Sequence, residues 1–294
     1  MAHGDLNVTG SRVDAHHHVW DLATLPQPWI DPVRQSAIAR SFDIEELRAT
    51  AVEAGVVQTV VVQTVAVAEE TPALLRLADQ DPLVAGVVGW VDLTQADVED
   101  AIARLRALPG GDRLVGVRHV VEAEPDPAWL DRPDVRAGLQ AVARSGLPYD
   151  ILVFPHQLPA AVRTVRDLPT ATFVLDHLAK PPLSTGGLET WAALLRELAT
   201  SPNVHAKLSG LVTEADWDRW SVDALRPAVE VALDAFGPQR LLWGSDWPVC
   251  LLATSYAAWV QASDELLSGL SDTERAAVLG DNARRVYRLT PDTH

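Results

Sequence analysis

Cysteine is nearly absent from this sequence, in which Cys250 is the only one among 294 residues. A disulfide within the chain needs two cysteines, so none can form, and the composition is typical of a reducing compartment. No histidine stands beside Cys250 to activate it as a nucleophile. We therefore expect a cytoplasmic protein in which Cys250 is a small buried side chain.

Basic residues are scarce, with 24 Lys and Arg against 40 Asp and Glu and a formal net charge of -16. Nucleic acids and anionic membranes are bound through clustered Lys and Arg, so neither is expected as a partner. A small anionic substrate stays compatible with this charge if a few cations line its pocket. We expect a small-molecule substrate, and the sequence leaves open whether the chain forms a homo-oligomer.

Long apolar runs are missing as well. The longest, "VVQTVVVQTVAVA", is interrupted by glutamines and threonines and is too short and too polar to span a bilayer. The first residues, "MAHGDLNVTGSRVD", have neither a basic start nor an apolar core and do not resemble a signal peptide. No low-complexity stretch or linker divides the chain. We predict one soluble domain over residues 1–294, with 1–10 as a flexible N-terminal extension.

What the sequence does contain is an alternation of short β-branched runs and amphipathic segments along nearly its whole length. This alternation is typical of parallel βαβ units. The runs predict eight strands, at 12–18, 59–65, 83–93, 114–120, 148–153, 172–177, 203–209 and 241–246. Eight strands, each followed by a helix in a chain of this size, favour a (β/α)8 TIM barrel. A doubly wound sheet is the alternative.

Capping residues mark several helix ends between and after these strands. Asp43 precedes an apolar pattern of helical spacing. After the eighth strand, "SDTERAAVLG" contains a capping box formed by Ser271 and Glu274. Gly280, the last residue of this motif, predicts the end of a helix.

Active sites of TIM barrels lie at the carboxyl ends of the strands, so polar residues there are the candidates. The first strand ends in three histidines, of which His16 and His18 point to one face and His17 to the other. Two imidazoles on one face can bind one Zn²⁺ ion. They can equally form a hydrogen-bonded structural pair.

Other strand ends carry ionisable groups too. Each has a structural alternative, as a satisfied histidine, a helix N-cap or an ion pair. Their convergence at one end of several strands favours a functional site. These residues are Arg118 and His119 on the fourth strand, His177 and Lys180 after the sixth, Lys207 and Ser209 on the seventh, and Asp246 after the eighth.

Five motifs occur in the order "DAHHHVWD", "GVRH", "LDHLAKPP", "HAKLSGL" and "WGSDWPVC". In this order they resemble the amidohydrolase superfamily, specifically the amidohydrolase-related family that contains lactonases of sugar acids such as L-fuconolactone and L-rhamnonolactone hydrolases. The resemblance covers nearly the whole chain. It implies a barrel whose site contains His16, His18, His177 and Asp246.

The sequence departs from many superfamily members at two strands. Strand five, "YDILV", lacks their histidine, and the nearest one is His156 in the following loop. Strand four lacks the carbamylated lysine or glutamate that bridges two metals. The resemblance therefore implies one divalent ion, zinc before others, held by His16, His18 and Asp246 together with His156. Some lactonase relatives look able to work without a metal, which leaves open whether the ion is needed.

The reaction implied by the resemblance is hydrolysis of a sugar-acid lactone. Asp246 and His177 are the expected catalytic residues, with Asp246 taking the proton of the attacking water and passing it to the leaving oxygen. Arg118, His119 and Lys180 are expected to bind polar groups of the substrate, and Arg118 and Lys180 also the oxyanion. A structural ion pair with one of the many acids is the alternative for these cations.

Tryptophan is abundant, with 10 against 4 Phe and 3 Tyr. Trp20, Trp29 and Trp247 follow the site motifs, where their rings can stack on a sugar or simply pack at the barrel rim. Two other functions stay open: a metal-dependent decarboxylase of an aromatic or unsaturated acid, and a non-catalytic sugar-acid-binding barrel. A phosphate site is disfavoured because the loops after strands seven and eight lack a glycine-rich turn.

Overall fold

Eight parallel strands form one sheet in the computed structural model, which describes residues 12–290. The strands pair in chain order as β1 Arg12–His17, β2 Val56–Val62, β3 Val84–Gly89, β4 Leu114–His119, β5 Tyr149–Ile151, β6 Phe173–Leu175, β7 Val204–Leu208 and β8 Leu241–Trp243. Each predicted strand overlaps one of these. The extension predicted at 1–10 lies outside the described residues.

β2 ends three residues before its predicted end. The backbone N–H groups of Thr64 and Val65 donate to the carboxylate of Glu70 over 2.8 and 3.0 Å. Backbone N–H groups in a strand normally donate to the adjacent strands. Strand pairing ends here because a buried side chain accepts these two hydrogen bonds instead. The predicted end of this strand is three residues too late, because the sequence pattern does not reveal the contact with Glu70.

The sheet closes into a barrel through backbone hydrogen bonds between the end of β1 and the segment that follows β8. The N–H of Asp246 donates to the carbonyl of His16 over 2.8 Å, and the N–H of His18 donates to the carbonyl of Trp247 over 2.7 Å. These bonds also hold the segment after β8 against the end of β1. The fold is a (β/α)8 TIM barrel, which confirms the prediction.

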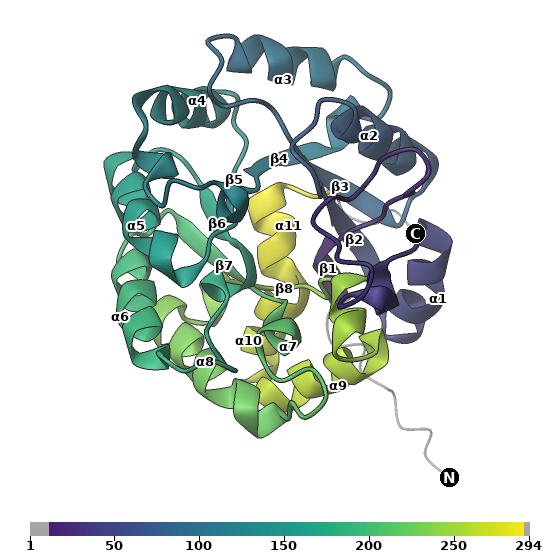
Figure 1. Cartoon of the computed structure of the whole chain (residues 1–294), viewed down its shortest axis with the longest axis vertical. Helices are drawn as coiled ribbons and strands as arrows, with labels where there is room; N and C mark the ends of the chain where they lie inside the picture. Colours follow the sequence, from purple (N-terminus) through teal and green to yellow (C-terminus); the bar gives the residue numbers. More distant parts are fainter. Residues whose placement is uncertain (1–11, 291–294) are drawn as a thin grey trace.

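Helices surround the strands on the outside (Figure 1). Their bounds are α1 Ile44–Glu53, α2 Glu70–Gln80, α3 Val98–Arg106, α4 Pro133–Arg144, α5 Leu158–Asp167, α6 Leu188–Ala199, α7 Leu211–Glu214, α8 Val222–Phe236, α9 Tyr256–Leu266, α10 Asp272–Ala276 and α11 Asn282–Tyr287. Asp43 caps α1 as predicted, because its side chain accepts a hydrogen bond from the N–H of Glu46. Among residues 12–290, no helix combines the length and apolar character needed to cross a bilayer.

The prediction that a helix ends at Gly280 is wrong. Ser271 and Glu274 do form the capping box that begins α10. The chain then passes through a π-helical turn that contains the buried Gly280 and continues into α11. The side chain of Asn282 donates to two backbone carbonyls next to β8, each over 2.7 Å. Packing of α11 against β8 overrides the local tendency of glycine to end a helix.

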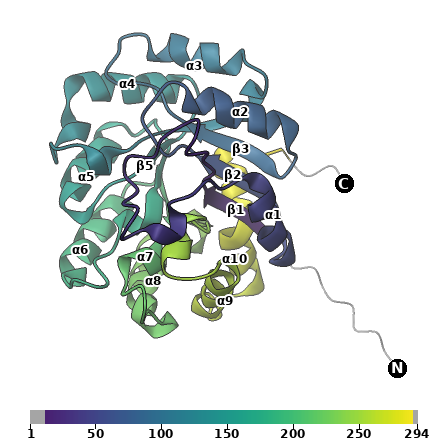
Figure 2. The same cartoon turned by 45° about the vertical axis from the view of Figure 1, so that its right-hand side comes forward.

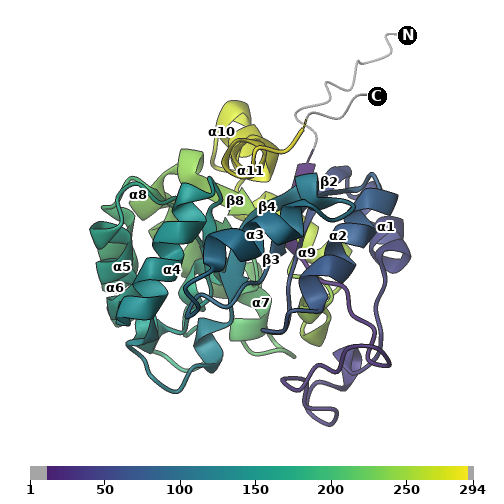
Figure 3. The same ribbon diagram turned by 90° about the horizontal axis from the view of Figure 1, so that it is seen from above.

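Two apolar cores lie on opposite sides of the strands. The larger core joins the strands to the surrounding helices. The smaller core fills the barrel and combines Val60, Val88 and Val174 of the strands with Val286 and Tyr287 of α11. Figure 1 shows α11 in the centre of the ring of strands, and Figure 3 shows α10 and α11 at the opposite end of the barrel from the segment between β1 and α1. One end of the barrel is therefore closed by α11, and the other end is left for a site.

Candidate active site

The carboxyl ends of the strands surround a cavity of about 690 Å³. Its lining includes His18, Arg118, His177 and Asp246, from the ends of β1, β4, β6 and β8. The segment between β1 and α1 passes over this end of the barrel (Figure 2) and contributes Trp29 to the wall. A concave site of this volume is typical of proteins that bind small molecules.

Asp246 is the residue on which the histidines converge. Its Oδ1 lies 3.4 Å from Nε2 of His18 and 3.8 Å from Nε2 of both His16 and His177. Asp246 is only 3% exposed. Burial raises the pKa of Asp246, although His177, Lys180 and Arg118 favour its charged form. A carboxylate with a raised pKa is suited to take up a proton during a reaction.

The backbone holds His177 and Asp246 in conformations that side-chain-bearing residues rarely adopt. All four residues of the turn His177–Lys180 have φ between 51° and 57°, and Asp246 has φ of 57°. Left-handed backbone at successive non-glycine residues is strained and persists only where contacts hold it. Oγ of Ser209 lies 2.8 Å from Nδ1 of His177, and the indole N–H of Trp191 donates to a carbonyl within this turn over 2.7 Å. Such strain is concentrated at functional sites.

His18 presents an unprotonated Nε2 to the site. Its Nδ1 lies 2.7 Å from the carbonyl oxygen of Val62, which can only accept, so the ring proton sits on Nδ1. Burial, followed by the nearby Arg118, lowers the pKa of His18 to about 3, and the ring stays neutral. Neutral imidazole with a free Nε2 is the form that binds metals.

The contacts of His16 are compatible with either tautomer of its ring. With its proton on Nε2, it donates toward Nε2 of His18 at 3.2 Å, while Nδ1 accepts from the ammonium of Lys207 at 3.1 Å. With its proton on Nδ1, it donates toward Oδ1 of Asp176 at 3.2 Å, and Nε2 becomes an acceptor that faces a guanidinium nitrogen of Arg118 at 3.4 Å. The ring can therefore serve either as a hydrogen-bond donor or as a metal ligand with a carboxylate behind it.

A buried ionic network lies next to His16. The ammonium of Lys207 is 2.6 Å from Oδ2 of Asp150 and 3.0 Å from Oδ1 of Asp176. A guanidinium nitrogen of Arg118 is 3.0 Å from Oδ2 of Asp176. Although burial opposes the charge on Asp176, Lys207, His16 and Arg118 hold its pKa well below the usual range. The network therefore keeps the acceptor for His16 ionised.

The sequence analysis did not identify Asp150 and Asp176. Both stand in apolar strand motifs, "YDILV" and "FVLDH", and both are fully buried. An acid in a buried strand needs a cation as its partner. Lys207 and Arg118 are cations on neighbouring strands. The presence of buried cations beside buried acids is the signal that would have identified Asp150 and Asp176.

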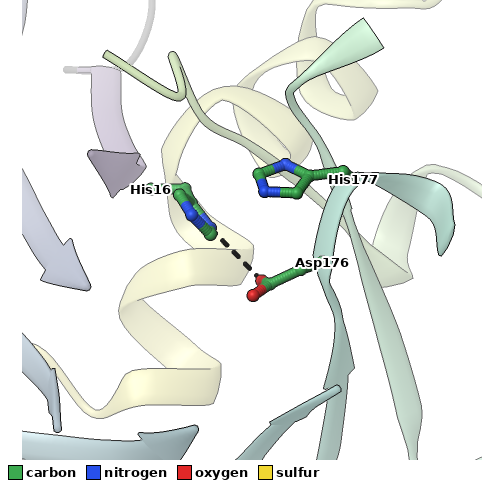
Figure 4. Close-up of side chains that lie close together, drawn as sticks. All are labelled: His16, Asp176 and His177. Atoms are coloured by element: carbon green, nitrogen blue, oxygen red, sulfur yellow. Dashed lines mark ion pairs between the residues drawn. The ribbon is translucent and has the colours of Figure 1, made fainter. Parts of the chain in front are cut away.

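Two groups of side chains bring three potential metal ligands within 4.8 Å of one another: His16, His18 and Asp246, and His16, Asp176 and His177. Figure 4 draws the second group, in which Asp176 and His177 both lie beside His16. There Asp176 is already paired with two cations. The first group offers two imidazole nitrogens and one carboxylate oxygen, a donor set that suits zinc. The first group therefore fits a divalent ion better than the second group does.

His156 does not belong to this group, and its predicted role is corrected. Its side chain is exposed, and its ring stacks against Phe154 with the centroids 6.1 Å apart. It does not line the cavity. The short turn after β5 carries it to the surface, so strand five contributes Asp150 below the site and no imidazole within it.

Lys180, His119 and Arg118 line the cavity, but protein partners hold all three. Nζ of Lys180 lies 2.5 Å from a carboxylate oxygen of Glu122. Nδ1 of His119 accepts from the indole of Trp90 over 3.0 Å, so its proton sits on Nε2, which faces a carboxylate at 2.8 Å. These residues shape the wall and leave few free donors toward a ligand.

The three tryptophans proposed to stack on a sugar have different positions. Trp29 lines the cavity and is 38% exposed. Trp20 and Trp247 are buried and do not line it, and each packs edge-on against Phe42, at centroid distances of 5.6 and 5.4 Å. The prediction for these two is corrected, because their rings belong to the larger apolar core. Trp217, which the sequence analysis missed, lines the cavity.

The fold and the site together define a class of protein. A TIM barrel whose mouth holds a His-x-His pair after the first strand, a histidine after the sixth and an aspartate after the eighth is an amidohydrolase-type barrel. The chain belongs to the amidohydrolase family, whose sequence model matches residues 13–289.

Similar proteins cover almost the full chain. An L-fucono-1,5-lactonase of Burkholderia ambifaria is 40% identical over 284 residues, which cover 95% of this chain and 96% of the relative. An L-fucono-1,5-lactonase of Burkholderia multivorans is 39% identical, with the same coverage. Among solved structures, an amidohydrolase from Burkholderia multivorans with bound Zn has a TM-score of 0.89 at 38% identity and covers 95% of this chain and 99% of that one.

Proposed function

We propose that this protein hydrolyses the cyclic ester of a sugar-acid lactone, a 1,4- or 1,5-lactone, with Asp246 as the base that activates water. The observation that carries the proposal is the buried Asp246 carboxylate on the cavity, with three imidazole Nε2 atoms within 3.8 Å. The relatives named L-fucono-1,5-lactonase, at 40% and 39% identity, support a sugar-acid lactone as the substrate.

In the proposed reaction Asp246 first accepts a proton from water and later donates it to the leaving oxygen. Asp246 takes a proton from the water as its oxygen attacks the ester carbonyl. His177 is neutral because burial lowers its pKa to about 4, so its Nε2–H can donate to the oxyanion while Nδ1 accepts from the hydroxyl of Ser209. The ring C–O bond then breaks, and Asp246 returns the proton to the leaving oxygen. Arg118 and Lys180 add positive potential to the site.

We also propose zinc as the ion that His16, His18 and Asp246 hold. Such an ion, when bound, supplies a Lewis acid that lowers the pKa of water and polarises the carbonyl. The Burkholderia multivorans amidohydrolase structure with bound Zn supports this choice of metal. The tautomer of His18, with its proton on Nδ1, leaves its Nε2 ready as a ligand.

The test is proton release at near-neutral pH on a panel of 1,4- and 1,5-lactones of sugar acids, because each turnover produces a carboxylic acid. We expect the wild type to hydrolyse some of these lactones and Asp246→Asn to lose at least about a hundredfold in kcat, the scale of a lost general base. Asp234→Asn, an exposed acid on α8, is the matched control and should keep full activity.

The outcomes separate the open alternatives. Silence of the wild type on the whole panel would overturn lactone hydrolysis, and CO2 release from an aromatic or unsaturated acid would replace it with decarboxylation. Binding of a lactone without turnover would favour a non-catalytic barrel. Equal kcat for the wild type and Asp246→Asn would remove Asp246 as the base.

A further inference from the structure

One wall of the cavity carries two carboxylates that the proposed reaction does not use. Glu122 lies in the turn after β4, and Glu214 is the last residue of α7, after β7. Both line the cavity together with Lys180. The three side chains come from three different strand-end loops, so the fold assembles this wall from separate parts of the sequence.

Glu122 and Lys180 satisfy each other. Their charged groups are 2.5 Å apart, and the ammonium of Lys180 also lies 4.8 Å from the ring centroid of Phe154. Burial opposes the charge on Lys180, but Glu122 and then Glu214 raise its pKa, so it remains an ammonium at neutral pH. This pair occupies one of the two carboxylates of the wall.

Glu214 has no such partner. Within residues 12–290, no side-chain hydrogen bond and no ion pair within 4 Å engages its carboxylate. Its backbone is held, because its carbonyl accepts from the N–H of Ser184 over 3.1 Å. The preceding Thr213 is anchored as well, by a hydrogen bond from its hydroxyl to the carbonyl of Gly210 over 2.8 Å. The fold thus positions Glu214 on the wall and leaves its oxygens available.

A half-buried carboxylate without a protein donor is only partly solvated, so a ligand that supplies a donor stabilises it. Burial raises the pKa of Glu214 to about 7, with Lys180 opposing the shift and Glu122 and Asp246 adding to it. At neutral pH the group can therefore both accept a hydrogen bond and donate one, as a hydroxyl partner requires. Trp217 follows Glu214 closely in the sequence and also lines the cavity. Its flat indole surface suits a sugar ring.

We propose that Glu214 selects hydroxylated lactones by binding hydroxyl groups on the substrate ring with its carboxylate. This inference rests on the proposed lactone hydrolysis and adds a specificity-determining residue to it. In its ionised form the carboxylate can accept from two neighbouring hydroxyls at once, and charged hydrogen bonds of this kind discriminate strongly. In its protonated form one oxygen donates to a hydroxyl instead. A lactone without hydroxyls gains nothing from the residue.

The test compares kcat/KM for the most active hydroxylated lactone of the panel with kcat/KM for the ring-matched lactone that has no hydroxyls, δ-valerolactone or γ-butyrolactone. We expect Glu214→Gln to lower the ratio of the two values at least about tenfold, mainly through KM of the hydroxylated lactone. Where the plain lactone turns over too slowly, the reciprocal of its inhibition constant replaces kcat/KM in the ratio. Glu230→Gln, on the outer surface of α8, should leave the ratio unchanged.

Glu214→Asp and a melting curve of each variant complete the design. Partial recovery of the ratio in Glu214→Asp supports a hydrogen-bonding carboxylate. An equal loss on both lactones assigns Glu214 to catalysis or to folding and overturns the inference, as does an unchanged ratio. These results are distinct from inactivity of the wild type on every lactone, which overturns the proposed function itself.

Discussion

At the scale of single residues, the orientation of His177 depends on a neighbour without a side chain. Gly210 has φ of +67°, and a Cβ on it would lie 2.6 Å from Nδ1 of His177. A methyl group there must displace the imidazole. We predict that Gly210→Ala lowers kcat on the best lactone about a hundredfold, the cost of misplacing a catalytic group by about 1 Å.

Gly55→Ala is the matched control for this prediction. Gly55 has φ of +74°, and no atom lies within 4 Å of an added Cβ. The control carries the same backbone strain, about 1–2 kcal/mol, without the clash. Steady-state kinetics and thermal melting separate the two effects: both variants should melt earlier, and only Gly210→Ala should lose kcat. Equal kcat in both would contradict the prediction.

His205 in β7 makes stability sensitive to acid. Burial, with Arg285 and Arg240 adding to it, lowers its pKa to about 4, below the value of about 6.5 expected in the unfolded chain. The unfolded chain therefore binds the proton more tightly, and stability present above about pH 6.5 is lost as the pH falls toward 4.

The variant that tests this is His205→Gln, which cannot titrate. When the pH falls from 7 to 4.5, the unfolding free energy of the wild type should fall by about 2 kcal/mol more than that of the variant. This figure is reduced for the partial solvent exposure of His205. Urea unfolding at the two pH values measures the difference. Parallel losses in the wild type and the variant would show that the histidine does not carry this dependence.

At the scale of elements, α11 connects the closed end of the barrel to the site. The hydroxyl of its Tyr287 donates to Oδ2 of Asp150 over 2.7 Å, and Asp150 pairs with Lys207 beside His16. The helix is thus a plug whose packing also supports the buried network. Its anchoring to β8 by Asn282 should matter for the stability of the whole barrel.

We predict that Asn282→Ala lowers the unfolding free energy by about 2 kcal/mol or more. The substitution removes the side-chain donor from the buried carbonyl of Leu241, a loss of about 1–3 kcal/mol, and from the partly buried carbonyl of Pro238, which adds a smaller loss. Ser271→Ala, which removes only the N-cap of the neighbouring α10, should cost about 1 kcal/mol. Chemical denaturation compares the two variants, and a smaller effect for Asn282→Ala than for Ser271→Ala would refute the anchoring role.

At the scale of the whole molecule, metal binding should be visible as stabilisation. A ligand that binds only the folded state stabilises it by about 2.7 kcal/mol at a hundred times its Kd. We predict that added zinc raises Tm of the metal-free protein by several degrees. The double variant His16→Asn, His18→Asn should lose this rise, whereas His156→Asn, which is exposed outside the group, should keep it. A zinc-induced rise that persists in the double variant would place the ion elsewhere.

The periodicity of the sequence was sufficient for the fold because it is a local property. Alternating β-branched runs and capped amphipathic segments specified eight strands and the start of α10 at Ser271. The same reasoning placed His16, His18, His177 and Asp246 at strand ends, and closure of the barrel brings them together. It failed at Gly280, where packing against β8 outweighed a local signal.

The sequence by itself determined the class of barrel and the residues at the strand ends, since side-chain alternation and strand order follow from short stretches of chain. Only the tertiary structure decided which of those residues meet. Trp20 packs against Phe42 and does not line the cavity, and the turn after β5 carries His156 to the surface. Three separate loops form the cavity wall on which Glu214 is unpaired. Such contacts join residues far apart in the chain, and their distances depend on how all eight strands close together.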